Sequence, residues 1–111
     1  MRQLEGVIPV LLTPFTKNGE VDEPALARLV KYLNSKNIGG FWVLGTGAED
    51  MNLTYQQRLR VAETVVEANA GKSPLVMGAG FFSMQDSMNF MNDTAHLEFD
   101  AYHYMPYHNL L

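Results

Sequence analysis

The sequence predicts an α/β fold built on parallel strands. Short apolar runs begin near Val7, Phe41, Leu75 and Ala101, and the segments between them have the apolar spacing of helices. Helix-capping residues stand at the boundaries between these segments. A repeat of strand, helix and strand places successive strands parallel, joined by right-handed crossovers. We therefore expect residues 1–111 to belong to one domain with about three strand–helix units and a fourth strand.

The first unit consists of the apolar run 7–12 and the helix that follows it. The run Val-Ile-Pro-Val-Leu-Leu is uninterrupted, which is typical of a strand buried on both faces. Asp22 can cap the helix, and Pro24 lies in its first turn, where a missing N–H costs no hydrogen bond. Apolar residues then recur at helical spacing and form one face: Leu26, Leu29, Val30 and Leu33.

The second unit begins with the apolar run 41–44, which predicts a strand. A glycine-containing loop follows, and the spacing of Thr54 and Gln57 predicts a capping box at the start of a helix. We expect that helix to end with Gly71 at its C′ position, because glycine adopts the left-handed conformation found there without steric cost.

The third unit starts at the apolar run 74–77, and a fourth strand is predicted at 101–105, where Pro106 ends it. Ser83 can cap the helix between these two runs. Apolar residues of that helix recur at helical spacing and predict its packing face: Met84, Met88, Met91 and Ala95.

Composition excludes several classes of protein. The chain has 111 residues, a formal net charge of -4 and no cysteine. Without cysteine there is no disulfide framework, thiolate nucleophile or cysteine zinc site. The negative charge argues against nucleic acid and acidic membrane surfaces as partners. The first apolar run is too short for a transmembrane span and no cleavage site follows it, so we expect a cytoplasmic location.

Ligands of parallel α/β proteins bind beyond the carboxyl ends of the strands. That edge comprises the loops 13–20, 45–52 and 78–82 and the residues from Pro106 onward. The second loop is the most informative, because the small residues at its start let backbone N–H groups turn toward an anion. The Thr46 hydroxyl can also orient a carboxylate or relay a proton. The same residues fit a plain tight turn, so the local sequence leaves both interpretations open.

Nucleotide and metal sites are not predicted. The Gly-x-Gly pairs at 45–47 and 78–80 lack the third glycine of a dinucleotide fingerprint, and no phosphate-binding loop is present. The histidines and carboxylates do not have metal-ligand spacing. We therefore expect neither a metal nor another cofactor.

Four lysines are available for imine chemistry: Lys17, Lys31, Lys36 and Lys72. An imine-forming lysine works best desolvated beside the reacting carbonyl. Lys31 and Lys36 fall on or near the first helix, and Lys72 precedes the third strand at the opposite end from the loops. Lys17 is on the correct side but in a polar turn. We expect none of them to form an imine.

Three histidines are present. His96 falls near a helix end, where a structural role is the simpler interpretation. His103 lies within the fourth predicted strand and is interpreted as a core histidine, on a face that the sequence does not determine. His108 follows the same strand at its carboxyl end and is the best placed of the three for function.

Several motifs occur together in one order and spacing. They are Thr-Pro-Phe at 13–15, Gly-Thr-Gly-Ala-Glu at 45–49, Gly-Ala-Gly at 78–80 and Pro-Tyr-His at 106–108. In this arrangement the chain resembles the pyruvate-dependent class I aldolases, the family that includes dihydrodipicolinate synthase and N-acetylneuraminate lyase. That family has Gly-Thr-Thr-Gly-Glu in the second motif and Pro-Tyr-Tyr in the last.

The resemblance implies a (β/α)8 TIM barrel, of which this chain is the N-terminal part. It also implies a lyase or aldolase that acts on pyruvate or a related 2-oxo acid, and a homo-oligomer. The reaction passes through an imine with a lysine on the sixth strand, which this chain does not contain. Such a barrel needs roughly 250 residues.

The resemblance also implies roles for individual residues. Thr46 matches the hydroxyl of the family's proton relay, and the N–H groups of Thr46 and Gly47 match those that hold the pyruvate carboxylate. Tyr107 matches the first tyrosine of the Pro-Tyr-Tyr motif. His108 replaces the second tyrosine and can still transfer protons, with a different pKa.

Two departures leave the reaction open. Gly47 removes a threonine hydroxyl of the family motif, and His108 removes a tyrosine that in dihydrodipicolinate synthase reaches a neighbouring subunit. Another 2-oxo-acid aldolase or a dehydratase therefore fits at least as well. The alternative function is a non-catalytic half-barrel whose open sheet edges associate with a second copy or another chain.

Overall fold

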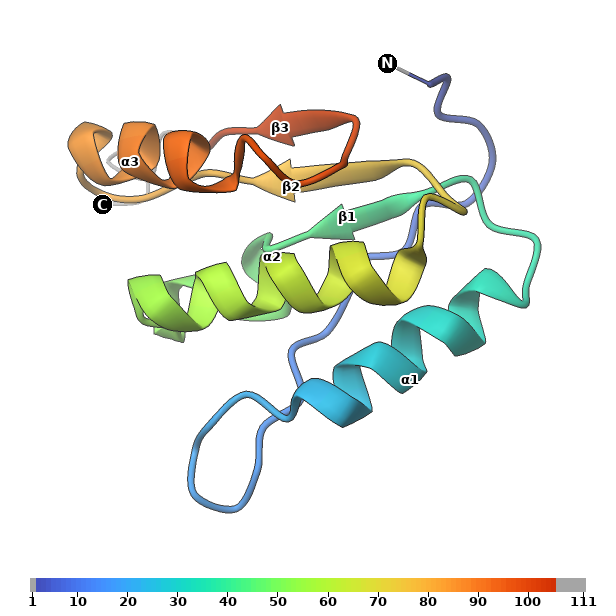
Figure 1. Cartoon of the computed structure of the whole chain (residues 1–111), viewed down its shortest axis with the longest axis horizontal. Helices are drawn as coiled ribbons and strands as arrows, with labels where there is room; N and C mark the ends of the chain where they lie inside the picture. The colour runs from blue at the N-terminus through green and yellow to red at the C-terminus, as the bar shows by residue number, and fades with distance from the viewer. Residues whose placement is uncertain (1, 106–111) are drawn as a thin grey trace.

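The computed structural model describes residues 2–105 and shows a parallel sheet packed against helices (Figure 1). The strands pair in sequence order and all in parallel. They are β1 (Phe41–Val43), β2 (Leu75–Gly78) and β3 (Ala101–His103). This parallel strand–helix order confirms the predicted α/β fold.

Residues 2–105 also form three α-helices and two short 3-10 turns. They are α1 (Glu23–Asn34), η1 (Thr46–Ala48), η2 (Asp50–Asn52), α2 (Tyr55–Asn69) and α3 (Met84–Thr94). The predicted helix starts are confirmed, because Asp22, Thr54 and Ser83 each accept a backbone N–H, and Gln57 completes the capping box. Gly71 follows α2 with a φ of +74°, as predicted for its C′ position.

The predicted first strand is not a regular strand. The run 7–12 meets β1 only at an isolated parallel bridge, where the Leu11 N–H donates to the Trp42 carbonyl at 3.0 Å. The Trp42 N–H donates in turn to the Pro9 carbonyl at 2.9 Å. Pro9 has no N–H to continue a ladder, which confines it to an edge position. The run therefore lies along β1 as an edge segment.

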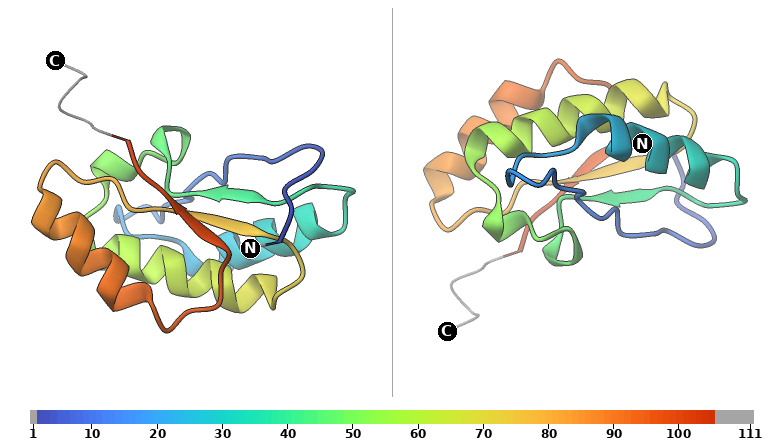
Figure 2. Two further views of the ribbon diagram at one scale, coloured as in Figure 1. Left: turned by 90° about the horizontal axis from the view of Figure 1, so that it is seen from above. Right: turned by 90° about the horizontal axis from the view of Figure 1, so that it is seen from below.

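All three helices lie on one side of the sheet (Figure 2). The strand residues that face them are fully buried: Phe41, Val43, Leu75 and Met77. Because side chains alternate along a strand, Trp42 and His103 face the other side. No helix within residues 2–105 covers that side, and the neighbouring Leu12 is 63% exposed.

Helix α3 buries a different face from the predicted methionine stripe. Met84 and Met88 are exposed, whereas Ser87, Phe90 and Thr94 are completely buried. The buried hydroxyls are tolerated because they are hydrogen-bonded. Thr94 donates to the Phe90 carbonyl at 2.7 Å, and the Ser87 hydroxyl accepts an N–H from the loop before the helix. A large aromatic ring and two satisfied hydroxyls therefore decide the orientation of this helix.

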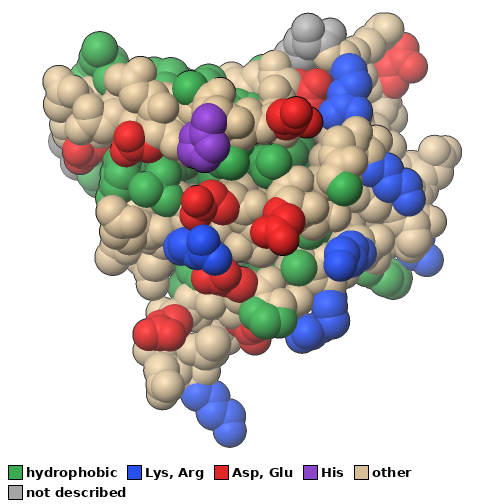
Figure 3. Space-filling model, viewed as in Figure 1, with side chains coloured by type: hydrophobic (Ala, Val, Ile, Leu, Met, Phe, Trp, Pro, Cys, Tyr) green, Lys and Arg blue, Asp and Glu red, His purple; other side chains and the backbone are tan. Residues whose placement is uncertain are grey.

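The outer surface of α1 and α2 carries intermixed acidic and basic side chains (Figure 3). Arg60 of α2 bridges to Glu23 of α1 and to Glu63 of its own helix. Exposed pairs of this kind contribute little stability, because solvent screens them. Within residues 2–105, no helix has the length and apolarity needed to cross a bilayer.

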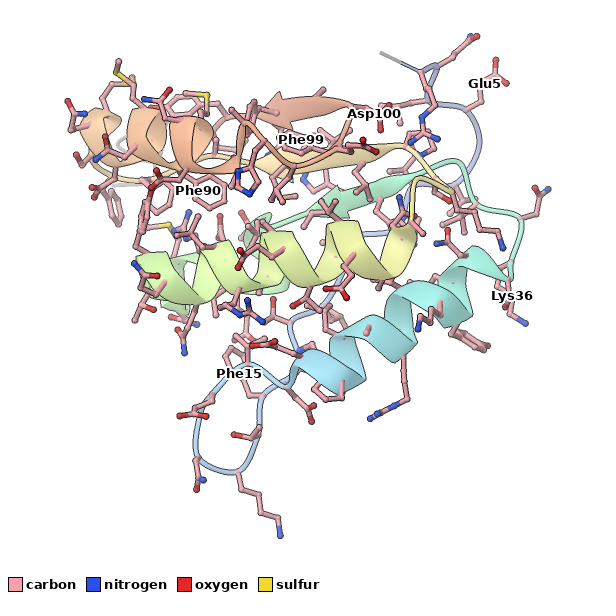
Figure 4. The ribbon with its side chains drawn as sticks, in the orientation of Figure 1. Glu5, Phe15, Lys36, Phe90, Phe99 and Asp100 are labelled. Atoms are coloured by element: carbon pink, nitrogen blue, oxygen red, sulfur yellow. The ribbon has the colours of Figure 1, made fainter. Side chains whose placement is uncertain are left out.

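Arg2 clamps the N-terminal segment to the end of the sheet opposite the loops. Its guanidinium makes two hydrogen bonds to the Asp100 carboxylate, each 3.0 Å long. It also donates to the carbonyls of Gly71 and Ser73, and Asp100 in turn accepts the Leu75 N–H at 2.8 Å. Figure 4 shows Asp100 at this end of the sheet. The Arg2 hydrogen bonds lower the pKa of Asp100 to about 2, with burial opposing them and the Leu75 N–H adding to them.

This clamp predicts an acid-labile contribution to stability. A carboxylate with a lowered pKa stabilises the fold fully above its unfolded pKa of about 3.9, and the contribution is lost as the pH falls toward 2. We expect Asp100→Asn to reduce by about 1 kcal/mol the stability lost between about pH 5 and pH 2, as measured by urea unfolding. Glu67→Gln, on the exposed face of α2, serves as the control and should leave that loss unchanged. An equal loss in Asp100→Asn and the wild type would contradict the assignment.

Candidate functional site

The carboxyl ends of the three strands meet at one edge of the sheet (Figure 1). Thr46 and Gly47 lie there in η1, directly after β1, and both are exposed. The loop 79–82 follows β2 at the same edge. The predicted site residues Tyr107 and His108 lie outside the residues that the structure describes.

The η1 turn leaves two backbone donors outside its own hydrogen bonds. The N–H groups of Ala48 and Glu49 donate back to Gly45 and Thr46, at 2.9 and 3.0 Å. Those of Thr46 and Gly47 lie at the open start of the turn, where helical geometry supplies no acceptor. The Thr46 hydroxyl makes no hydrogen bond to any residue in 2–105. Two N–H groups and a hydroxyl are thus grouped on an exposed turn, a set that suits a carboxylate.

Two left-handed residues bracket this turn. Leu44 and Glu49 both have a φ of +58°, which is uncommon for residues with a side chain. Each such residue costs on the order of 1 kcal/mol and persists only where its surroundings hold it. Leu44 is completely buried, and the Glu49 carboxylate accepts from Asn52 at 3.4 Å. Packing therefore holds the loop in a conformation that its local sequence does not prefer.

Contacts from other segments fix the turn further. The buried Thr13 hydroxyl donates to the Ala48 carbonyl at 2.8 Å and joins the first loop to the second. A Cβ atom on Gly45 would lie 2.8 Å from the Trp42 indole nitrogen. A Cβ atom on Gly47 would lie 2.9 Å from a Val10 methyl group. The glycine at position 47 therefore has a steric reason, since a threonine there would require Val10 to move.

Arg58 joins the second loop to the third. It is almost fully buried, donates to the Gly80 carbonyl, and lies over the Phe81 ring at 3.8 Å from the ring centre. It also approaches the Met51 sulfur at 3.6 Å. Arg58 is not distinguished in the sequence from a surface residue, since an arginine in the first turn of a helix ordinarily lies at the surface. Its position shows that the two loops are mechanically connected.

His103 lies on the side of the sheet away from the helices and is half-buried. Its ring stacks on Trp42 with centroids 4.0 Å apart and planes 15° apart. Its Nε2 lies 3.0 Å from the Val43 carbonyl oxygen. Burial lowers the pKa of His103, and the Val43 carbonyl and the Asp50 carboxylate partly oppose that effect. The predicted core histidine therefore packs against the strand that leads into the η1 turn.

The four lysines are all exposed, and Lys36 lies at the end of the molecule away from the η1 turn (Figure 4). His96 is exposed after α3. No group of three histidine or carboxylate side chains within residues 2–105 is arranged to hold a metal ion.

The contact between Gly78 and the η1 loop predicts a sensitive position. A methyl group on Gly78 would lie 2.0 Å from the Leu44 carbonyl oxygen and 2.8 Å from the His103 ring. We expect Gly78→Ala to lower the free energy of unfolding by about 3 kcal/mol, because neither backbone can yield cheaply. Gly19→Ala is the control. It meets no atom within 4 Å and should cost only about 1 kcal/mol for its left-handed φ. Equal losses in urea unfolding would argue against a tight contact at Gly78.

Comparison with known proteins identifies the family. The sequence model of the dihydrodipicolinate synthetase family matches residues 3–110. The 4-hydroxy-tetrahydrodipicolinate synthase of Bartonella henselae is 33% identical over 107 residues, which cover 96% of this chain and 36% of that protein. The chain thus spans about a third of the length of the curated relatives it matches.

Solved structures agree with this result. Proteus mirabilis N-acetylneuraminate lyase superposes with a TM-score of 0.89 at 29% identity, over 93% of this chain and 35% of that one. The E. coli K12 prophage protein YagE, solved in complex with pyruvate, has a TM-score of 0.84 at 24% identity, over 89% and 33% of the two chains. The first of these superpositions supports the partial TIM barrel together with the family, and the second supports the fold alone. The chain belongs to the dihydrodipicolinate synthetase family.

Proposed function

We propose that this chain carries the carboxylate-binding part of a lyase that acts on pyruvate or a related 2-oxo acid. The observation that carries the proposal is the η1 turn, where the N–H groups of Thr46 and Gly47 and the Thr46 hydroxyl are exposed together. The loop stands at the carboxyl ends of parallel strands, where such folds bind ligands. The pyruvate complex of YagE and the names of the relatives support the choice of ligand.

In this proposal the two N–H groups donate to the substrate carboxylate, and the Thr46 hydroxyl orients it and relays a proton. Neutral donors bind an anion here without a lysine or arginine, which is compatible with the net charge of -4. Tyr107 and His108 supply further proton-handling groups. Because Gly47 keeps its N–H but lacks a hydroxyl, Thr46 is the only side-chain donor that the turn itself offers.

The same proposal assigns imine formation to a lysine that this chain does not contain. The four lysines present are exposed, whereas an imine-forming lysine works best desolvated beside the reacting carbonyl. The chain by itself is therefore expected to bind a 2-oxo acid without turning it over. The reaction class is a carbon–carbon lyase or a dehydratase, in a cytoplasmic homo-oligomer that needs no metal or other cofactor.

Pyruvate binding to the chain tests this proposal. In a titration followed by amide NMR, pyruvate should shift the Thr46 and Gly47 resonances, whereas neutral pyruvamide should not. We expect Thr46→Val to weaken pyruvate binding about two- to ten-fold, because it removes one hydrogen bond and keeps the N–H. Thr16→Val, in the exposed turn 16–20, is the matched control and should bind as the wild type does.

Two outcomes would count against the proposal. One is an equal response to pyruvate and pyruvamide, which would show that the carboxylate is not recognised. The other is a covalent adduct with pyruvate after borohydride reduction of this chain, because it would place an imine on one of the four exposed lysines.

A second candidate function is a non-catalytic half-barrel that associates through its open sheet face. The observation in its favour is the apolar surface on the side without helices, where Val10 is 44% and Leu12 63% exposed. Both residues lie on the edge segment beside β1. A second copy could cover this surface and pair with the unprotected strand edges.

Light scattering coupled to size-exclusion chromatography separates the two functions. The half-barrel hypothesis predicts twice the mass of the chain, and Leu12→Glu should return it to the monomer by placing a charge in the apolar surface. Tyr32→Glu is the control, since Tyr32 is equally exposed but lies on the outer face of α1. A monomer at high concentration in the wild type would remove this hypothesis.

A further inference from the structure

His103 stands where β3 meets the end of β1 and the start of the η1 loop. Its Nε2 contacts the carbonyl of Val43, the residue directly before the left-handed Leu44. Its ring lies flat on Trp42, and a Cβ atom on Gly45 would lie 2.8 Å from the Trp42 indole nitrogen. The His103 ring therefore contacts both Trp42 and Val43, the two residues of β1 that precede the loop with Thr46.

The Val43 contact determines the tautomer of the ring. A carbonyl oxygen only accepts hydrogen bonds, so Nε2 carries the proton and Nδ1 carries the lone pair. Nδ1 is buried and has no hydrogen-bond partner among residues 2–105. Protonation would place a second N–H on this buried atom, which has no hydrogen-bond acceptor among residues 2–105. A buried donor without a partner is costly, whereas the neutral ring fits.

The surroundings of the ring leave it little freedom to rearrange in place. A methyl group on Gly78 of β2 would lie 2.8 Å from the His103 Cε1 atom. A methyl group on Gly45 would lie 3.8 Å from the same atom. The neighbouring strands present an indole ring and backbone to it. Among residues 2–105, Asp50 of η2 is the charged group that acts on the ring, and its attraction for a cationic ring is smaller than the effect of burial. A protonated ring is therefore expected to leave this position.

We propose that neutral His103 is a positioning residue for the Thr46–Gly47 loop, and that its protonation releases the end of β1 and weakens 2-oxo-acid binding. The proposal rests on the proposed carboxylate-binding role of that loop. The sign of the effect is distinctive. A cationic histidine near an anion site would ordinarily strengthen binding by charge attraction, whereas here protonation removes the contact that shapes the site.

The pH range follows from the direction of the shift. Because burial lowers the pKa of His103, the neutral form is the dominant one in the folded chain at neutral pH. Loss of the contact begins only as the pH falls below the ordinary histidine value of about 6.5. Pyruvate remains a carboxylate throughout this range, so its own ionisation does not contribute.

The experiment follows the amide resonances of Gly45 and Thr46 and the imidazole resonances of His103 as the pH falls from about 7.5 to about 5. It is done with and without pyruvate on the wild type, His103→Gln, His103→Phe and His96→Gln. Glutamine keeps a donor near Nε2 but does not titrate, whereas phenylalanine keeps the stack on Trp42 without a donor. His96 is exposed and is the matched control.

The expected result has three parts. In the wild type and His96→Gln, the affinity for pyruvate falls about five-fold or more at the acidic end, and the Thr46 amide moves with the His103 midpoint. In His103→Gln, the affinity for pyruvate at neutral pH is close to the wild-type value, and it no longer depends on pH. In His103→Phe, binding is weak at both ends of the range.

Other outcomes overturn the inference. They are stronger binding at acidic pH, a pH dependence that survives in His103→Gln, or a Thr46 amide that does not follow the His103 titration. If pyruvate does not bind at any pH, the proposed function fails, and the ligand-free amide shifts still decide whether His103 positions the loop. If His103→Phe does not fold, the comparison of the wild type with His103→Gln gives the answer.

Discussion

Burial of one face of the parallel sheet against the helices is the interaction on which the rest of the structure depends. Phe41 and Val43 of β1 and Leu75 and Met77 of β2 present four apolar side chains to that side, all fully buried. Burying side chains of this size contributes roughly 1.5–3 kcal/mol each. This packing fixes the register of the strands, and the register decides where each strand ends and each loop begins. The geometry of the candidate site therefore depends on the edge of the sheet where the carboxyl ends of the strands lie.

The packed sheet holds the loop after β1 in an unfavourable backbone conformation. Leu44 and Glu49 are held in left-handed conformations, and glycines at positions 45 and 78 allow neighbouring groups to approach closely. The hydrogen bond from Thr13 offsets part of this cost. His103 stacks on Trp42 on the side of the sheet without helices. Two left-handed residues and two close glycine contacts thus surround the turn where the backbone donors are displayed.

Local signals in the sequence were reliable where the chemistry is local. A cap depends on one side chain and an N–H a few residues away, so Asp22, Thr54 and Ser83 revealed their helices correctly. The prediction of a regular first strand was wrong because pairing depends on a partner strand and on the missing N–H of Pro9. The methionine stripe predicted for α3 was wrong for a related reason, except at Met91, which is partly buried against the core. Buried Ser87 and Thr94 need hydrogen-bond partners that only the folded chain supplies.

The sequence by itself determined the alternation of strands and helices, the helix starts and the motifs that resemble the family, because periodicity and capping act over a few residues. It also located Thr46 and Gly47 in the loop after a strand. Only the tertiary structure decided that Arg58 joins two loops and that His103 lies on Trp42 beside the first of them. Arg58 and Gly80 are 22 positions apart, and Trp42 and His103 are 61 positions apart. Contacts over such separations form only when the strands pair in their register, so the local sequence does not predict them.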